Sequence, residues 1–253
     1  MAEIISICNQ KGGVGKTTTA INLAAGLAAA EKRTLLIDID PQGNAGSGLG
    51  IDKHTIKSGI YNVLIGEIKA EEVVIPTSLE YLKLIPSNTN LVGAEIELLD
   101  NVSRETILKR ALNTISSEYD YVIIDCPPSL GLLTLNAMVA SNSVLIPVQC
   151  EYYAMEGVAD LSRTIQLVKE RMNKDLKVKG IILTMFDGRT SLSRMVADEI
   201  KKHFKESVFE VIIPRNVKLA EAPSFGKPIL LYDVRSKGAL SYFDLAKEIL
   251  HRV

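Results

Sequence analysis

The chain has 253 residues, of which 47% are hydrophobic and 23% charged, and its formal net charge at pH 7 is −1. This apolar share is enough for a sizeable core, whereas the balanced charge gives no general attraction to nucleic acids or membranes, so any such binding requires a local patch. Without a signal peptide or an apolar run near ~18 residues, the sequence favours one cytoplasmic domain spanning 1–253.

The first predicted elements are an apolar strand near 4–8 and an alanine-rich helix over 17–30, joined by a glycine loop. The loop reads Lys-Gly-Gly-Val-Gly-Lys-Thr-Thr over 11–18. It is a variant of the Gly-x-x-x-x-Gly-Lys-[Ser/Thr] phosphate loop in which Gln10 stands at the position of the first glycine. A strand that feeds a glycine loop and then a helix is the context that this motif requires.

Such a loop binds phosphate through its backbone. Glycines allow successive N–H groups to point inward, and the following helix adds its free N–H groups and the positive end of its dipole. Lys16 is expected to reach the β- and γ-phosphates, and the Thr17 hydroxyl to ligate Mg²⁺. The remaining residues expected to surround the nucleotide are Gly12, Gly13, Val14, Gly15 and Thr18.

Apolar runs alternate with helical patterns along the rest of the chain. The runs are β-branched and nearly continuous, which is typical of parallel strands buried on both faces. They predict a doubly wound, mostly parallel α/β sheet with helices on both faces and its ligand at the carboxyl ends of the strands. Further strands are expected near 34–38, 82–86, 121–125, 144–148, 178–184 and 208–213, and further helices near 104–116, 154–172, 192–205 and 239–251. The more polar segment 51–101 is expected to add helices and one strand, and its role is left open.

Two of these strands lead into carboxylates. Asp125 ends one strand, where a Walker B aspartate acts on Mg²⁺ directly or through its water, and an unpaired charge there would otherwise be costly. Asp40 follows another strand in a glycine-rich turn, where it either orients water and metal or only caps an Asp-Pro turn, and the residues leave these two readings about equal. Asp38 shares a face with Asp40 and is a weaker candidate for metal or loop support.

The three cysteines are Cys8, Cys126 and Cys150. They lack the spacing of metal ligands, and two of them end apolar runs. Reduced, mostly buried thiols of a cytosolic protein are therefore expected.

Four motifs together resemble one family. The loop at 11–18, Asp-Ile-Asp-Pro-Gln-Gly-Asn from Asp38, Ile-Asp-Cys-Pro-Pro-Ser from Ile124 and Pro-Arg-Asn from Pro214 resemble the deviant Walker A ATPases of the ParA/MinD family over nearly the whole chain. The similarity is greatest to the chromosomal, Soj-like ParA branch. It implies that Lys11, otherwise a solvated turn lysine, contacts the nucleotide across a dimer interface. It also implies that Asp40, in switch I, positions the attacking water at the metal site.

The resemblance also implies where the base of ATP lies. The adenine would sit between the turn after Thr184 and the Pro-Arg-Asn turn, with Met185 and Pro214 as apolar walls and Asn216 reading its edge. From the residues alone, Met185 would be core and Pro214 a strand stop.

The implied activity is weak, partner-stimulated ATP hydrolysis for chromosome or plasmid segregation. ATP and Mg²⁺ would close a homodimer that holds double-stranded DNA without sequence preference on the nucleoid, and a ParB-type centromere-binding protein would stimulate hydrolysis. Between 212 and 238 there are five basic and two acidic side chains, an excess that is usually only a solvated face. The resemblance assigns DNA contacts to Arg189, Arg215, Lys218 and Arg235.

Two alternatives come from the same family. A MinD-like regulator that cycles on and off membranes ends in a basic amphipathic helix, and the stretch 242–253 has core-like apolar spacing without a further basic tail. An iron–sulfur reductase or scaffold needs two exposed cysteines per chain of a symmetric dimer, because clusters take thiolates in sets of four. Neither alternative is favoured.

Overall fold

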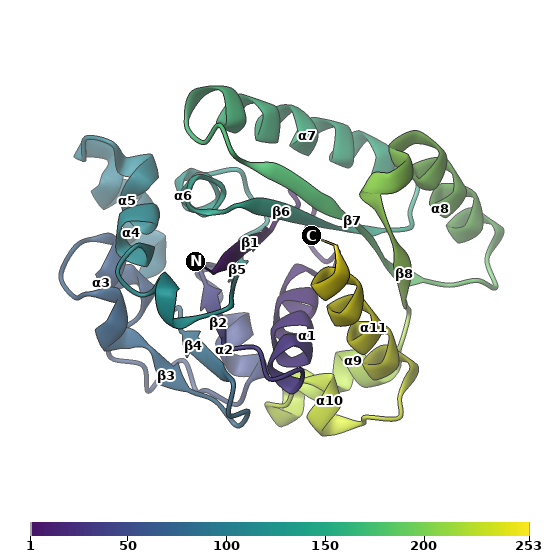
Figure 1. Cartoon of the computed structure of the whole chain (residues 1–253), viewed down its shortest axis with the longest axis horizontal. Coiled ribbons are helices and arrows are strands. Elements are labelled where there is room, and N and C mark those ends of the chain that lie inside the picture. The colour runs from purple at the N-terminus through teal and green to yellow at the C-terminus, as the bar shows by residue number, and fades with distance from the viewer. Residues whose placement is uncertain (1, 253) are drawn as a thin grey trace.

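The computed structural model describes residues 2–252 and contains one eight-stranded sheet in the order β3-β4-β2-β5-β1-β6-β7-β8 (Figure 1). Every neighbouring pair is parallel except β3–β4, which is antiparallel. The predicted mostly parallel sheet is therefore confirmed. The strands are β1 (Glu3–Ile7), β2 (Thr34–Asp38), β3 (Ile75–Pro76), β4 (Leu82–Ile85), β5 (Tyr121–Asp125), β6 (Ser143–Gln149), β7 (Lys177–Phe186) and β8 (Val208–Pro214).

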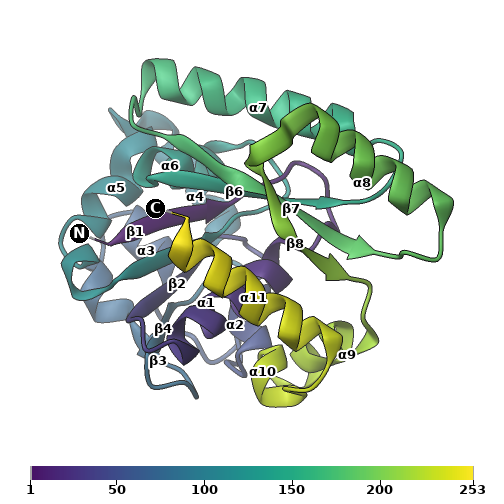
Figure 2. The same cartoon turned by 45° about the vertical axis from the view of Figure 1, so that its right-hand side comes forward.

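Helices cover both faces of the sheet, as Figures 1 and 2 show from two directions. One face carries α1 (Lys16–Ala29), α2 (Asn44–Gly48), α9 (Val217–Glu221), α10 (Ile229–Tyr232) and α11 (Lys237–His251). The other carries α3 (Ile60–Leu64), α4 (Leu91–Glu97), α5 (Ile107–Leu112), α6 (Leu132–Ala140), α7 (Ala154–Arg171) and α8 (Ser191–Phe204). The doubly wound architecture is thus the predicted one.

The central strands are buried on both sides, which explains their continuous apolar sequences. Along β2, Leu35 and Ile37 belong to the core cluster under α3–α8, whereas Leu36 belongs to the cluster on the side of α1 and α11. Successive side chains of a strand point to opposite faces, so both faces must be apolar. Most polar side chains near the central strands therefore lie where the strands end, and the carboxyl ends carry the predicted site.

Some predicted elements were wrong or missing. The expected helix over 104–116 is broken into a 3₁₀ turn (Arg104–Thr106), α5 and a second 3₁₀ turn (Ser116–Glu118). Ser103, which precedes it, has a left-handed backbone with φ 58°, and Asn113 and Thr114 are poor helix formers. The short edge strand β3 gave no recognisable run, and α6 gave no helical period because it is buried almost all round.

Within the part of the chain that the structure describes, no helix is both long enough and apolar enough to cross a membrane.

Candidate nucleotide-binding site

The glycine loop leaves β1 and enters α1 at the carboxyl edge of the sheet. Gly13 and Gly15 have φ of 72° and 88°, a left-handed conformation that few other residues adopt without strain. Gly15 is the N-cap of α1, so the free N–H groups of the first turn face the loop. Val14 is buried, and its carbonyl accepts a hydrogen bond of 2.8 Å from the Thr184 hydroxyl at the end of β7. The loop therefore has a fixed shape that can surround an anion.

Two lysines flank this loop in different environments. Lys16 is 7% exposed, and its Nζ donates to the carbonyl oxygen of Lys11 at 3.0 Å. Burial lowers the pKa of Lys16, while the negative charges of Asp125 and Asp40 oppose that effect. The Lys11 side chain is 40% exposed and forms an ion pair of 2.7 Å with Glu151, after β6. Lys16 is thus buried within the loop, whereas the Lys11 side chain reaches out of it to Glu151.

Asp38 and Asp125 lie side by side, because β2 and β5 are neighbours in a register that aligns the two residues. Both are fully buried. Asp38 accepts hydrogen bonds from the backbone N–H groups of Asp40, Ala45 and Gly46 at 2.9–3.2 Å. These contacts hold the turn after β2, and loop support was one of its two predicted uses.

Asp125 has no such partners. Neither of its carboxylate oxygens makes a hydrogen bond in the described structure. Burial and, to a smaller extent, the charge of Asp38 raise the pKa of Asp125 well above its usual range. The nearby Thr17 hydroxyl acts in the opposite direction, although it makes no hydrogen bond of normal geometry to Asp125. A buried carboxylate with free lone pairs needs a cation or a metal-bound water. The site therefore fits Mg²⁺.

The rest of the expected metal shell fits as well. No three His, Cys, Asp or Glu side chains between residues 2 and 252 converge to hold a metal on their own. Mg²⁺ needs no such cluster, because it commonly takes one or two protein oxygens and completes its shell with water and phosphate. The Thr17 hydroxyl and the Asp125 carboxylate are the protein oxygens that fit this kind of Mg²⁺ site.

Asp40 begins the turn that leads into α2. It is 7% exposed, its Oδ1 accepts from the backbone N–H of Gln42 at 2.9 Å, and its carbonyl accepts from Gly43 N at 2.9 Å. One carboxylate oxygen thus caps the turn, and Oδ2 makes no hydrogen bond to the described residues. Asp40 also lines a cavity of about 360 Å³ beside the glycine loop. Capping the turn and orienting water or metal, the two roles that the sequence left open, are therefore compatible.

Two adjoining cavities lie above the loop. One of about 360 Å³ is lined by loop residues together with Asp40, Gln42, Asn44 and Pro128. The other, of about 370 Å³, is lined by Thr184, Ile213, Pro214, Asn216, Leu219 and Tyr242. Gly15, Thr18 and Met185 line both. The first cavity has the glycine loop, Lys16 and Asp40 in its wall and the second is more apolar, which matches the phosphate and base ends of a nucleotide.

The predicted base-binding residues meet in the second cavity. Met185 lies just below Gly15, with a strained backbone of φ 50°. Asn216 is the N-cap of α9, because its Oδ1 accepts from Leu219 N at 3.3 Å. Its amide NH₂ makes no hydrogen bond to residues 2–252 and can donate to a ligand. Behind them, the Tyr242 and Thr19 hydroxyls are buried and 3.1 Å apart, which ties α11 to α1.

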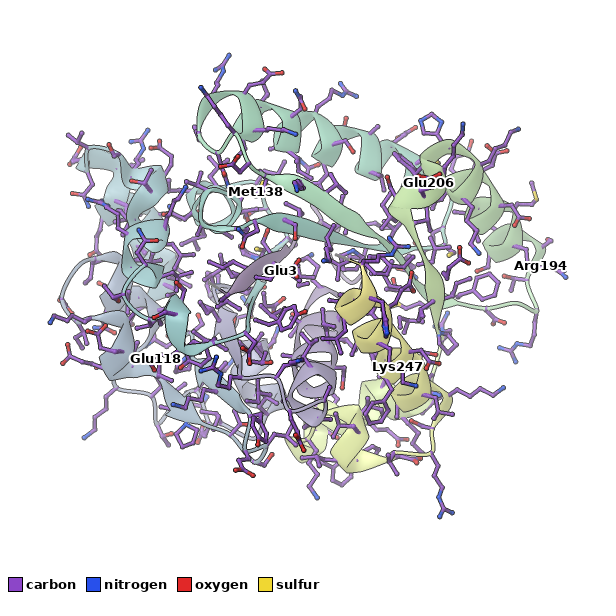
Figure 3. The ribbon with its side chains drawn as sticks, viewed as in Figure 1. Glu3, Glu118, Met138, Arg194, Glu206 and Lys247 are labelled. Atoms are coloured by element: carbon purple, nitrogen blue, oxygen red, sulfur yellow. The ribbon has the colours of Figure 1, made fainter. Side chains whose placement is uncertain are left out.

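The four predicted DNA-binding residues lie after β7 and β8, but their charges are not equally available. Arg189 forms a two-pronged ion pair with Asp187, at 2.7 and 2.8 Å, and these bonds lower the pKa of Asp187 to about 2. Lys218 pairs with Glu221 at 2.9 Å. Arg215 and Arg235 form no ion pair with the described residues. Arg194, on α8, lies at the outer edge of the molecule (Figure 3).

Two glycines bring the turn after α2 against the segment between α9 and α10. Gly50 has φ 82° and Gly226 has φ 60°. A Cβ on Gly226 would lie 2.5 Å from Cα of Gly50, and a Cβ on Gly50 would lie 3.0 Å from the Gly226 carbonyl oxygen. The two backbones therefore touch without an intervening side chain.

The cysteines are all buried. Cys8 and Cys126 follow the neighbouring strands β1 and β5, and their sulfur atoms are 3.4 Å apart. Cys150 lies apart from them, after β6. With no thiol at the surface among residues 2–252, the structure offers nothing to the iron–sulfur alternative, which requires exposed cysteines.

Several residues that shape the site were missed from the sequence. Asn9 donates to the Pro147 carbonyl at 2.7 Å and accepts from Lys11 N at 3.0 Å, which fixes the start of the loop. Thr184 bonds to the Val14 carbonyl in the middle of the glycine loop, and Glu151 forms an ion pair with the Lys11 side chain. Asn9 and Thr184 are polar residues at the carboxyl ends of predicted strands, and this position alone could have marked them as site residues.

Comparison with known proteins agrees with this geometry. The family model described as an AAA domain matches residues 2–178. The chain is 58% identical over 252 residues to the chromosome partitioning protein ParA of Myxococcus xanthus, covering 100% of this chain and 89% of that protein. It is 56% identical over 249 residues to the sporulation initiation inhibitor protein Soj of Bacillus subtilis, covering 98% of each.

A solved structure shares the whole fold. The Mycobacterium smegmatis protein described as cobyrinic acid a,c-diamide synthase, with bound ADP and magnesium, superimposes with a TM-score of 0.88 at 38% identity, over 99% of this chain and 94% of that one. The phosphate loop, the paired strand-end carboxylates and full-length identity above one half all lead to one assignment: the chain belongs to the ParA/Soj family of P-loop chromosome partitioning ATPases.

Proposed function

We propose that this chain is a DNA-partitioning ATPase whose ATP-bound homodimer holds DNA and whose hydrolysis releases it. The single observation that carries the proposal is the unpaired, buried carboxylate of Asp125 beside the glycine loop and Lys16. It fits a magnesium nucleotide and has no structural role of its own. The ParA and Soj relatives support the partitioning role.

The cofactors are ATP or ADP with Mg²⁺. The phosphates would occupy the cavity lined by residues 12–18, and the base would occupy the cavity walled by Met185 and Pro214, with the Asn216 amide at its edge. Mg²⁺ would be held by Thr17 and, directly or through water, by Asp125. The metal neutralises charge on the transferred phosphoryl group.

Asp40 is proposed to orient the attacking water. Asp40 lines the phosphate cavity, its Oδ1 keeps the turn in shape, and its Oδ2 makes no hydrogen bond to residues 2–252. Lys16 adds positive charge to the β- and γ-phosphates from within the subunit. Lys11 would leave Glu151 and reach the phosphates of the second copy, so that the dimer forms only when ATP is present.

The DNA surface would combine the basic residues of both copies. Arg215 and Arg235 have free charges, whereas Arg189 and Lys218 would have to exchange Asp187 and Glu221 for phosphate. Contacts to phosphate carry no sequence information, so binding would be non-specific and would place the dimer on the nucleoid. A ParB-type centromere-binding protein would stimulate hydrolysis.

The test is DNA binding with ATP and with ADP over a salt series, using random-sequence duplexes. We expect binding with ATP only. The logarithm of the affinity should fall linearly with that of the salt concentration, with a slope of about −0.9 per phosphate contact. Equal binding with ADP, or no dependence on salt, would contradict the proposal.

A further inference from the structure

Two buried thiols face each other at the carboxyl ends of β1 and β5, and the proposed function uses neither of them. Cys8 follows β1 and Cys126 follows β5, and both side chains are fully buried in the same core cluster. The register of the two strands pairs Ile7 with Asp125, so the cysteines come next in step. Their sulfur atoms are 3.4 Å apart. Figure 1 shows β1 and β5 side by side in the middle of the sheet.

This arrangement matches the geometry of a disulfide. Neighbouring strands lie about 4.8 Å apart, within the range of roughly 4.4–6.8 Å that separates the Cα atoms of bridged cysteines. The sulfur atoms need to approach from 3.4 Å to about 2.05 Å, which small rotations of the two side chains provide. The backbone can therefore stay in place while the bond forms. Cys150, after β6, makes no sulfur–sulfur contact with residues 2–252.

A cation lies near the pair. Burial lowers the pKa of Lys16, and the charges of Cys126 and Cys8 are among those that oppose this effect. The Lys16 ammonium is therefore within electrostatic reach of both sulfur atoms, and positive charge stabilises a thiolate. Burial acts the other way and raises the pKa of Cys126 well above its usual range. The pair should therefore react more slowly than an exposed thiol, and its oxidant must be small and uncharged, as hydrogen peroxide is.

The two cysteines stand where two segments of the nucleotide site begin. Cys8 directly precedes Asn9, at the start of the glycine loop. Cys126 directly follows Asp125 and begins the loop 126–131, whose Pro128 lines the phosphate cavity. A covalent bond between the two sulfur atoms would tie these segments together, so that neither could move alone.

We propose that Cys8 and Cys126 form a reversible disulfide on exposure to peroxide, and that this bond slows ATP turnover by joining the glycine loop to the loop 126–131. The modification site stands on the sulfur contact, the strand register and the burial of both thiols. Only the effect on turnover rests on the proposed ATPase function.

Oxidation of the pair proceeds in two balanced steps. The thiolate of one cysteine attacks an oxygen of hydrogen peroxide, the O–O bond breaks, and the leaving hydroxide takes up the proton that the thiol released. The second thiol gives up its proton and attacks the sulfur of the resulting sulfenic acid, and the S–O bond breaks as water leaves. Two thiols and one peroxide thus become one disulfide and two waters. A dithiol reductant restores both thiols by exchange.

The test uses the folded full chain and its Cys150→Ala variant, which keeps only the proposed pair. Each is treated with hydrogen peroxide, freed of it with catalase, and then alkylated in denaturant. The unsubstituted chain has three thiols, and we expect one to remain. Cys150→Ala should keep none, at the mass of a single chain less two hydrogens, and dithiothreitol should restore both thiols. Cys8→Ala and Cys126→Ala are the matched controls, which should form no bond within the chain.

Four outcomes would overturn the modification site. They are no loss of thiols in the folded chain under conditions that oxidise the denatured chain, a bond between two chains instead of within one, a bond within the chain of Cys8→Ala, and oxidation to sulfinic acid that dithiothreitol does not reverse. If a control variant fails to fold, the unsubstituted chain and Cys150→Ala still decide, because both retain the pair.

The turnover test separates the modification from its effect. Oxidised Cys150→Ala should release phosphate at least about threefold more slowly than the same chain after reduction, because loop movements often limit turnover. Cys8→Ala should release phosphate at equal rates after the two treatments. A disulfide with unchanged turnover would overturn the proposed tie between the two loops. A reduced chain that hydrolyses no ATP would instead contradict the proposed function and leave the disulfide site standing.

Discussion

Lys11→Ala tests the dimer switch, and its effect can be estimated from the structure. If each Lys11 makes one charge-assisted bond to the partner's phosphate, the two bonds of a symmetric dimer are worth about 3–6 kcal/mol. Each lysine must first leave Glu151, and that ion pair is worth only about 0.2–1 kcal/mol because the side chains are 40% and 48% exposed. A net loss near 3 kcal/mol raises the dimer dissociation constant roughly a hundredfold.

Nucleotide binding by the monomer should survive this change. The contact between Lys16 Nζ and residue 11 uses the backbone carbonyl, which alanine keeps. The assay is light scattering after size-exclusion chromatography with a non-hydrolysable ATP analogue, together with calorimetry of the monomer. Dimers of Lys11→Ala at the same protein concentration as the unsubstituted chain would refute the reasoning.

Glu151→Gln is the matched variant, because it removes the competing ion pair and keeps the lysine. It should tighten the dimer by up to about 2 kcal/mol, or up to about thirtyfold. Weaker dimers would mean that Glu151 supports the bound state of Lys11 and does not compete with it.

Four further single variants, and one double variant, address the site and its scaffold. Lys16→Ala should weaken ATP binding at least about a hundredfold, since it removes charge-assisted bonds to two phosphates, and calorimetry that finds full affinity would mean that the loop is misassigned. Asp40→Ala should bind ATP and dimerise yet hydrolyse little in a phosphate-release assay, so normal turnover would move the catalytic role elsewhere. Tyr242→Phe and Thr19→Val should each destabilise the fold by about 1–3 kcal/mol, because each leaves a buried hydroxyl unpaired, and each kcal/mol should lower the melting temperature by about 2–4 °C. The double variant should be less destabilised than the sum of the two, and strict additivity in thermal unfolding would contradict the pairing.

Much of this fold was readable because parallel strands buried on both faces leave unmistakable apolar runs. Seven strands were located within one or two residues, and the order of the motifs along the chain was enough to predict a shared edge. Elements that lack a pattern of their own were not readable: β3 has two residues, and α6 is apolar on nearly every side. Their positions are determined by the elements around them, which only the folded chain reveals.

The residues of the candidate site also fall into those that the sequence could predict and those that it could not. Local spacing predicted Lys16, Thr17 and Asp125 as site residues from one short segment each, and the structure brings the three together. Pairings across the sheet were hidden, because Glu151 lies 140 residues from Lys11 in the sequence. The acidic partners of the predicted DNA-binding residues illustrate a second limit. A count of charges between 212 and 238 does not tell which of them are already neutralised.

At the contact between Gly50 and Gly226, two backbone segments meet with no side chain between them. Side chains at an interface absorb small movements by changing rotamer, but two touching backbones have no such freedom. A displacement of Gly50 toward Gly226 would therefore push directly on the backbone of the stretch between Lys218 and Arg235.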